Sequence, residues 1–228
     1  QLELSEAQQS TTRPTHDLDA WDLVQRGMAC LNEPTTDGNA RARKLFERAI
    51  EFDPDFSRAF TGLAYSHHRD MLFQTPEAHD EKLEALLAAA RRAVKLDEHD
   101  ALAQMELGIA LVFAGQFEEA IGQLDRAIAL NPSNAIAHAA LGQAMTLLGR
   151  PDDGIPCLER AFRINPRDPR NHIYFAFMAR AHLTARRYDD AVKWSRDAAQ
   201  RHSKNPEPHL LLSAALGHLG RTDEARAE

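Results

Sequence analysis

The sequence is poor in cysteine and in aromatic residues. It has two cysteines, Cys30 and Cys157, and aromatic residues make up 7% of the chain. Both cysteines fall inside expected helices and lack the spacing of a metal or redox site, which argues against a disulfide framework and favours a reducing compartment. No run of 18 apolar residues exists and no secretory signal peptide is recognisable, so we expect a cytoplasmic protein without membrane insertion.

The sequence also lacks the common motifs of catalytic and cofactor sites. It contains no G-x-x-x-x-G-K-[ST] loop, no G-x-G-x-x-G and no H-E-x-x-H. His67 and His68 are adjacent and therefore point to different faces of a helix, and no two histidines are spaced i,i+4. Acidic pairs such as Glu118-Glu119 stand at expected helix starts, where the helix dipole explains them at least as well as acid–base catalysis. We expect no enzyme activity, no cofactor and no metal.

The sequence does contain one pattern that occurs twice in succession. The segments ALAQMELGIALVFAGQFEEAIGQLDRAIALNPSN (101–134) and AIAHAALGQAMTLLGRPDDGIPCLERAFRINPRD (135–168) follow each other at a period of 34 residues. The shared positions include Leu107 with Leu141, Gly108 with Gly142 and Pro132 with Pro166. A fixed period of this length indicates stacked units in place of one closed core.

Each copy is typical of two helices. Apolar residues recur at three- and four-residue steps over 101–113 and again over 117–130. Gly115 favours a helix end because glycine adopts the left-handed conformation cheaply, and Pro132 cannot continue the second helix. The small residues Gly108, Ala120 and Ala127 should let the two helices approach closely.

These features resemble the tetratricopeptide repeat, whose 34-residue period they share, together with the L-G and P positions of its L-G…A…F…P signature. The resemblance implies an all-α fold, a right-handed superhelical solenoid of antiparallel helix pairs. We expect residues 1–17 to be a lead-in or linker from an upstream domain, partly disordered or docked on the array. The array should occupy residues 18–228, with repeats at 18–55, 56–100, 101–134, 135–168 and 169–205 and a partial repeat at 206–228.

Two irregularities interrupt the period. An insertion around residues 71–80 could lengthen the first helix of its repeat and cap the array, or form a lid or contact surface. Pro156 falls within an expected second helix, so we predict that it kinks this helix or moves its start later. The chain begins with Gln1, and we expect it to be a piece excised from a longer protein.

The family resemblance also implies a binding surface. In such arrays the first helix of each pair lines a concave groove, and its second, fifth, ninth and twelfth positions face the ligand. A mostly apolar groove suits an amphipathic helix, although these residues could instead be buried between neighbouring repeats. Relatives that grip acidic chaperone tails carry Lys and Asn there, and this chain lacks that set. The predicted peptide-binding residues are Trp21, Val24, Met28, Tyr65, Leu102, Met105, Ile109, Val112, Ile136, Ala139, Gln143, Ile173, Phe177 and Arg180.

Charge is distributed unevenly along the chain. The net charge of −7 argues against nucleic-acid binding. Residues 160–204 nevertheless hold 11 Lys and Arg against 4 Asp and Glu, which gives this segment +7 and leaves −14 on the remainder. The basic segment could hold an anionic partner or the acidic end of another copy, or it could simply be a solvated surface.

A second resemblance concerns the first repeats. LDAWDLVQRG followed by NARARKLFERAIEFDPDFSRAFTGLAYSHHRD, within residues 18–70, is similar to the opening of repeat arrays that follow a class III adenylate cyclase or a TolB-like segment in bacterial multidomain proteins. It implies a regulatory arm of a larger bacterial signalling protein, whose parent could be a nucleotide cyclase. The predicted function is a non-catalytic scaffold that binds a protein or peptide partner, including another segment of the parent chain. The alternative is a self-association module that dimerises the parent enzyme as a homodimer.

Overall fold

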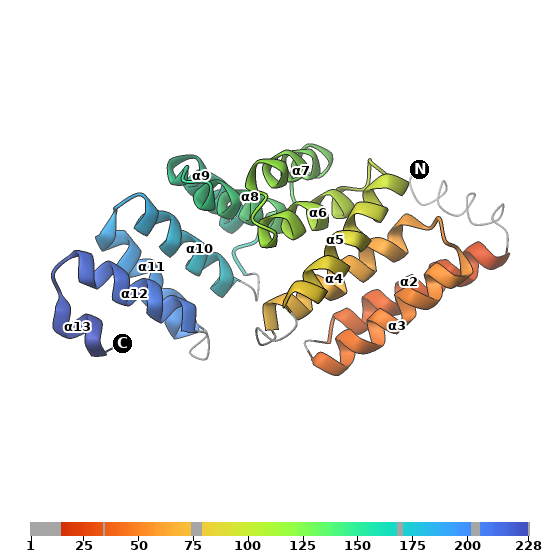
Figure 1. Ribbon diagram of the computed structural model, residues 1–228, viewed down its shortest axis with the longest axis horizontal. Coiled ribbons are helices and arrows are strands. Elements are labelled where there is room, and N and C mark those ends of the chain that lie inside the picture. The colour runs from red at the N-terminus through yellow and green to blue at the C-terminus, as the bar shows by residue number, and fades with distance from the viewer. Residues whose placement is uncertain (1–14, 34, 74–78, 168–170, 202–205, 228) are drawn as a thin grey trace. The chain divides into compact units, whose positions relative to one another are not determined.

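The computed structural model describes residues 15–33, 35–73, 79–167, 171–201 and 206–227 (Figure 1). Within these ranges the chain forms twelve α-helices and no strand, which confirms the predicted all-α class. The helices belong to two compact units, residues 1–114 and 115–228. Most of the predicted lead-in, residues 1–14, lies outside the described residues.

The first unit contains five helices in which neighbours along the chain pack side by side (Figure 1). α2 contacts α3, α4 contacts α5, and α4 also lies against both α2 and α6. The helices are α2 (Thr15–Leu31), α3 (Thr36–Phe52), α4 (Ser57–Phe73), α5 (His79–Leu96) and α6 (Ala101–Phe113).

The second unit repeats this arrangement. α8 pairs with α9, α10 pairs with α11, and α10 also contacts α8 and α12. The final helix, α13, is six residues long and has no buried residue. The helices are α7 (Phe117–Leu130), α8 (Ala135–Leu147), α9 (Pro151–Ile164), α10 (Asn171–Thr184), α11 (Tyr188–Arg201), α12 (Pro206–His218) and α13 (Thr222–Ala227).

We call α2, α4, α6, α8, α10 and α12 the first helices of their repeats. The second helices are α3, α5, α7, α9, α11 and α13. Each second helix from α3 to α11 buries three residues: the second follows the first by four positions, and the third follows the second by three. This stripe of buried residues forms the core of its repeat. Such spacing places all three residues on one helix face. The stripes are Ala42, Phe46 and Ala49; Leu86, Ala90 and Ala93; Ala120, Leu124 and Ala127; Gly154, Leu158 and Ala161; and Ala191, Ser195 and Ala198.

Phe46 of α3 fills the space between two glycines. Its side chain is fully buried, and a Cβ added at Gly27 of α2 would lie 2.5 Å from Phe46 Cε1. A Cβ added at Gly62 of α4 would lie 2.4 Å from the same atom. The ring therefore needs both glycines, because real carbon atoms do not approach this closely.

In the second unit, α8 and α9 meet through their backbones. A Cβ on Gly142 would lie 2.7 Å from the carbonyl oxygen of Gly154, and a Cβ on Gly154 would lie 2.5 Å from that of Gly142. Thr146 Oγ1 donates a hydrogen bond to Gly142 O at 2.8 Å, so this buried hydroxyl is satisfied within α8. Gly142 is the repeat equivalent of Gly108, for which the sequence predicts a close approach, and it lies at the contact between α8 and α9.

Four turns between successive helices of the described chain contain a left-handed residue. Gly115, Gly149 and Gly220 have φ values of +72°, +85° and +73°, which confirms the role predicted for Gly115. In the α10–α11 turn Arg186 adopts the same left-handed conformation, with a φ of 59°. A side chain is disfavoured in this region by about 1–2 kcal/mol, and nothing in the sequence pattern predicts the exception.

Of the two effects predicted for Pro156, a later start of its helix was wrong, whereas a kink stays a prediction. α9 runs from Pro151 to Ile164 with Pro156 inside it. Proline has no backbone N–H and cannot donate to the carbonyl of Asp152, the partner it would otherwise have one turn earlier. Both residues are exposed, so that carbonyl belongs to a solvated turn. Pro151 fits the first position of the helix, where a missing N–H has no consequence.

One boundary also differs from the expected one. α2 begins at Thr15, before the predicted array start at residue 18. α3 begins at Thr36 because Thr35 caps it, its Oγ1 accepting a hydrogen bond from Gly38 N at 3.0 Å. The predicted insertion at 71–80 lengthens α4, which continues to Phe73, whereas residues 74–78 lie outside the described residues.

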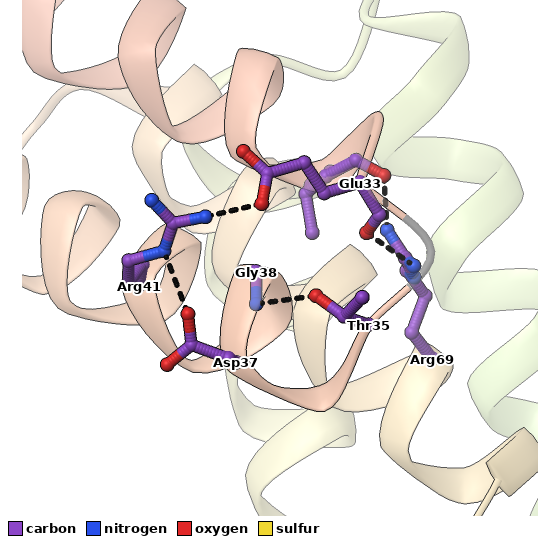
Figure 2. Close-up of polar contacts among 7 residues, drawn as sticks. Glu33, Thr35, Asp37, Gly38, Arg41 and Arg69 are labelled. Atoms are coloured by element: carbon purple, nitrogen blue, oxygen red, sulfur yellow. Dashed lines mark hydrogen bonds and ion pairs between the residues drawn. The ribbon is translucent and has the colours of Figure 1, made fainter.

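An arginine from α4 holds the turn between α2 and α3 (Figure 2). Arg69 donates hydrogen bonds to the carbonyls of Leu31 and Glu33, which lie at and just beyond the end of α2. Arg41 of α3 pairs with Glu33 and Asp37 on the other side of this turn (Figure 2). Carbonyls at a helix end need such partners because they have none within the helix, so α4 fixes the first hairpin as well as its own.

The contact between Phe46 and Gly62 generates a testable prediction. Gly62→Ala should lower the free energy of unfolding by about 1–3 kcal/mol because its methyl group overlaps the buried ring. Adding Phe46→Leu should recover part of this loss, since a smaller side chain leaves room for the methyl group. Urea unfolding followed by circular dichroism measures both effects.

Gly122→Ala is the matched control for this prediction. A Cβ at Gly122 of α7 meets nothing within 4 Å. The substitution should therefore be neutral or stabilise the helix by up to about 1 kcal/mol. If Gly62→Ala were as well tolerated as the control, the close contact with Phe46 would not limit stability.

Candidate functional site

All predicted peptide-binding residues lie on first helices. Trp21, Val24 and Met28 belong to α2 and Tyr65 to α4, whereas the other ten residues are divided among α6, α8 and α10. Because α4 lies between α2 and α6, and α10 between α8 and α12, equivalent positions on successive first helices share a face within each unit. The binding role of these residues stays a prediction.

Their exposure separates them into three groups. Val24, Met105, Ile109 and Ala139 are buried, with between 1% and 6% of their surface exposed. Trp21 and Leu102 are exposed at 43% and 45%. The remaining residues are half-buried: Met28, Tyr65, Val112, Ile136, Gln143, Ile173, Phe177 and Arg180. The buried group fits the alternative of packing between repeats, and the other two groups remain accessible to a partner.

In the second unit, the accessible predicted residues lie on α8 and α10. Ile173 and Phe177 are one helical turn apart on α10 and pack partly on a core cluster that includes Ala135 and Ala139 of α8. Ile136 occupies the position of α8 that is equivalent to Ile173. These three apolar side chains remain partly exposed and are the ones a partner could cover.

Two polar residues accompany this apolar face. Gln143 and Arg180 occupy equivalent positions on α8 and α10. Arg180 forms an ion pair with Glu207 of α12, and the two side chains keep 29% and 34% of their surface exposed. Solvent partly screens an ion pair with this exposure, so its contribution to stability is modest.

Sequence reasoning missed an aromatic cluster in the same unit. The rings of Phe162, Phe175 and Trp194 lie with centroids 5.1–5.7 Å apart. The guanidinium of Arg201 lies over the Phe175 ring at 4.3 Å, a favourable cation–π geometry. These residues come from α9, α10 and α11, and their spacing in sequence gives no periodic signal. Their concentration in a chain with few aromatic residues was the only available indication.

Sequence reasoning also missed a group of buried polar side chains in the first unit. Asn39 of α3 donates to Asp70 Oδ1 of α4 at 2.6 Å and to the carbonyl of Ser66 at 2.9 Å. Arg43 pairs with the other carboxylate oxygen of Asp70. Nearby, His68 Nδ1 lies 3.0 Å from Glu106 Oε2, and the two side chains are only 10% and 1% exposed. Buried charges are usually paired in this way, since an isolated one would be costly.

His67 lies beside this group without a hydrogen-bond partner for its buried Nδ1. The pKa of His67 is lowered from 6.5 to about 4, mainly by burial and also by the positive charge of Arg43, while the negative charge of Asp70 opposes the shift. His67 is therefore neutral in the folded protein at neutral pH. This makes it a structural residue with a consequence for acid stability.

Metal-binding residue types are not clustered in the described part of the chain. No three His, Cys, Asp or Glu side chains there are grouped so that they could hold a metal ion. None of the described helices is long and apolar enough to cross a membrane. Four basic residues of 160–204 form ion pairs: Arg163 with Glu159, Arg180 with Glu207, Arg187 with Asp152 and Arg196 with Glu224.

Residues 105–169 and 148–206 match the family model of the tetratricopeptide repeat. This segment consists of tetratricopeptide repeats. Its helices, turns and buried stripes continue in the same pattern through the rest of the described chain. A search of curated proteins finds no match to the chain.

Several solved structures share the fold over most of their length. The chain is similar to the thermophilic protein TTC0263 of Thermus thermophilus, with 21% identity, a TM-score of 0.62 and coverage of 86% of this chain and 98% of that one. It is similar to Pseudomonas aeruginosa pilF, with 20% identity, a TM-score of 0.65 and coverage of 94% and 90%. It also resembles YrrB, described as a tetratricopeptide repeat protein with an unusual peptide-binding site, with 16% identity, a TM-score of 0.54 and coverage of 83% and 90%.

The lowered pKa of His67 predicts a loss of stability in acid. Between pH 6.5 and about 4 the unfolded chain binds a proton at this histidine that the folded chain does not, so stability must fall as the pH falls. With allowance for partial solvent exposure, this loss is about 1–2 kcal/mol. Urea unfolding at a series of pH values measures it.

His67→Gln should flatten this part of the pH profile, because glutamine does not titrate. His99→Gln is the matched control, since His99 is exposed in the turn before α6. It should leave the profile of the unmodified chain unchanged. A His67→Gln profile as steep as that of the control would show that other groups cause the acid sensitivity.

Proposed function

We propose that the chain is a non-catalytic scaffold that binds a peptide or an amphipathic helix of a partner protein on its first helices. The observation that supports this most directly is the face of α8 and α10 in the second unit. There Ile136, Ile173 and Phe177 stay partly exposed, although apolar side chains of this size are usually covered in a helical core.

The chemistry of this face suits a helical ligand. Apolar side chains at i, i+3, i+4 and i+7 of an amphipathic helix could cover Ile136, Ile173 and Phe177. Gln143 and Arg180 would then meet polar groups or a carboxylate at the edge of the ligand. The peptide-binding site named for the similar structure YrrB supports a peptide as the class of ligand.

We further propose that the scaffold is a regulatory arm of a larger bacterial signalling protein, such as an adenylate cyclase. The support for this is the resemblance of residues 18–70 to the repeat arrays that follow such enzymes. In that setting the ligand is a segment of the parent chain or of a protein that controls it. The chemistry would reside elsewhere in the parent.

Fluorescence anisotropy with labelled synthetic peptides tests the binding proposal. The probes are amphipathic helical peptides with Leu at i, i+3, i+4 and i+7, and scrambled peptides of the same composition. The helical peptides should bind and the scrambled ones should not. Ile136→Glu and Ile173→Glu should each raise the Kd about tenfold or more, which is about 1.4 kcal/mol, because each places a charge on the apolar face.

Leu130→Glu is the control for these variants. Leu130 of α7 is 42% exposed in the same unit but lies on a second helix, so its replacement should leave the Kd unchanged. Circular dichroism should show equal helicity in all variants. If no helical peptide binds, or if Leu130→Glu weakens binding as much as Ile173→Glu, the proposed face is wrong.

A further inference from the structure

The first helices bury the same two positions in successive repeats. Positions are counted from Ala20 in α2 and His172 in α10, which align with the first residues of α4, α6, α8 and α12. The fifth position is buried in α2, α4, α8 and α10, where it is Val24, Thr61, Ala139 and Ala176, all between 1% and 7% exposed. Each of these helices contacts the next first helix in its unit, directly after it in the series. The fifth position therefore belongs to the face that receives the following repeat.

The tenth position belongs to the face that packs on the preceding repeat. It is Ser66 in α4, Ala110 in α6, Ala181 in α10 and Ala215 in α12, and all four side chains have 0% exposure. Each of these helices contacts the preceding first helix of its unit. Small residues are needed there because neighbouring first helices approach closely.

Two helices depart from this rule, each at one position. Leu210, at the fifth position of α12, is 68% exposed, the highest value among the exposed large apolar side chains of the described chain. Ala29, at the tenth position of α2, is also exposed. α12 therefore exposes the face on which a following first helix packs in other repeats. α2 exposes the face that packs on a preceding first helix in other repeats.

The residues around these two positions continue both faces. On α12, Pro206, Ala214 and Gly217 are exposed in line with Leu210, and a Cβ at Gly217 would meet nothing within 4 Å. On α2, Trp21 and Gln25 are exposed in line with Ala29, and Trp21 keeps 43% of its surface. A large aromatic side chain on one face and small residues on the other are sterically complementary.

The charges of the two units favour the same contact. Residues 1–114 contain 12 Lys and Arg against 20 Asp and Glu, a net charge of −8. Residues 115–228 contain 15 Lys and Arg against 14 Asp and Glu, a net charge of +1. Two copies that join first unit to second unit avoid the repulsion that two first units would have.

We propose that the α2 face of one copy, built on Trp21, Gln25 and Ala29, packs on the α12 face of a second copy, built on Leu210, Ala214 and Gly217. In this contact α2 of one copy packs on α12 of the other copy, in the same way that α10 packs on α8 within one chain. The contact is heterologous, since it joins two different faces, and each added copy leaves one face of each kind open. The chain therefore assembles head to tail, and it does not stop at a dimer unless a ring closes.

Sedimentation velocity of the 228-residue chain over a rising concentration series tests this contact. The weight-average mass should grow beyond that of two chains, and added salt should reduce it, because the two units differ in charge. Leu210→Glu and Ala29→Glu should each remain monomeric at 25.5 kDa. Ala214→Glu should behave like Leu210→Glu, because it lies on the same face.

Mixing the two monomeric variants is the decisive experiment. Leu210→Glu keeps an intact α2 face and Ala29→Glu keeps an intact α12 face, so the mixture should form one complex of two chains, about 51 kDa or twice 25.5 kDa, and grow no further. Leu130→Glu, which removes an equally apolar exposed side chain from α7, should assemble like the unmodified chain. Circular dichroism should show that all the variants keep their helicity.

Three results would overturn the proposal. The unmodified chain could stay monomeric throughout the series. Ala29→Glu could still form dimers alone, which would indicate a contact of α12 with α12. The mixture of variants could stay monomeric while the unmodified chain assembles, which would place the contact elsewhere. None of these results bears on peptide binding to α8 and α10, which is measured with separate variants.

Discussion

Close approach between paired helices is the constraint on which the rest of this structure depends. Where α8 meets α9, Gly142 and Gly154 bring the two backbones into contact, and no side chain could be inserted between them. In the first unit the same problem is solved by one ring between two glycines, since Phe46 occupies the volume that Gly27 and Gly62 leave empty. Both solutions fix the distance between helices, and that distance decides which residues can reach a neighbouring repeat.

Much of the architecture was predictable because the relevant signals are local. A glycine that ends a helix acts through its own φ, which is why the role of Gly115 could be predicted from the sequence; Gly149 and Gly220 take the same conformation. The buried stripes of α3, α7 and α9 follow from spacing alone. Arg186 and Pro156 were exceptions because each adopts a conformation that its own type disfavours, and only the surrounding turn or helix determines the outcome.

The candidate site was less predictable because exposure depends on neighbours. Met105 and Leu102 are three residues apart on α6, and both were expected to face a ligand, yet one is 3% and the other 45% exposed. The polar group around Asp70 and the ring cluster around Trp194 join residues from two or three helices. A spacing rule along one helix cannot predict such groups, since it has no information on what lies across the interface.

The contrast between α13 and the helices before it has a consequence for local motion. α13 has six residues and buries none of them, whereas α9 and α11 each bury several. Its amide hydrogens are therefore held by backbone hydrogen bonds that water can reach, with little apolar burial to oppose their opening. In a stack of repeats that contact only their neighbours, fraying begins at such an element and progresses inward. Amide hydrogen exchange should accordingly be fastest in α13 among the helices of the second unit and slow toward the glycine contact of α8 and α9.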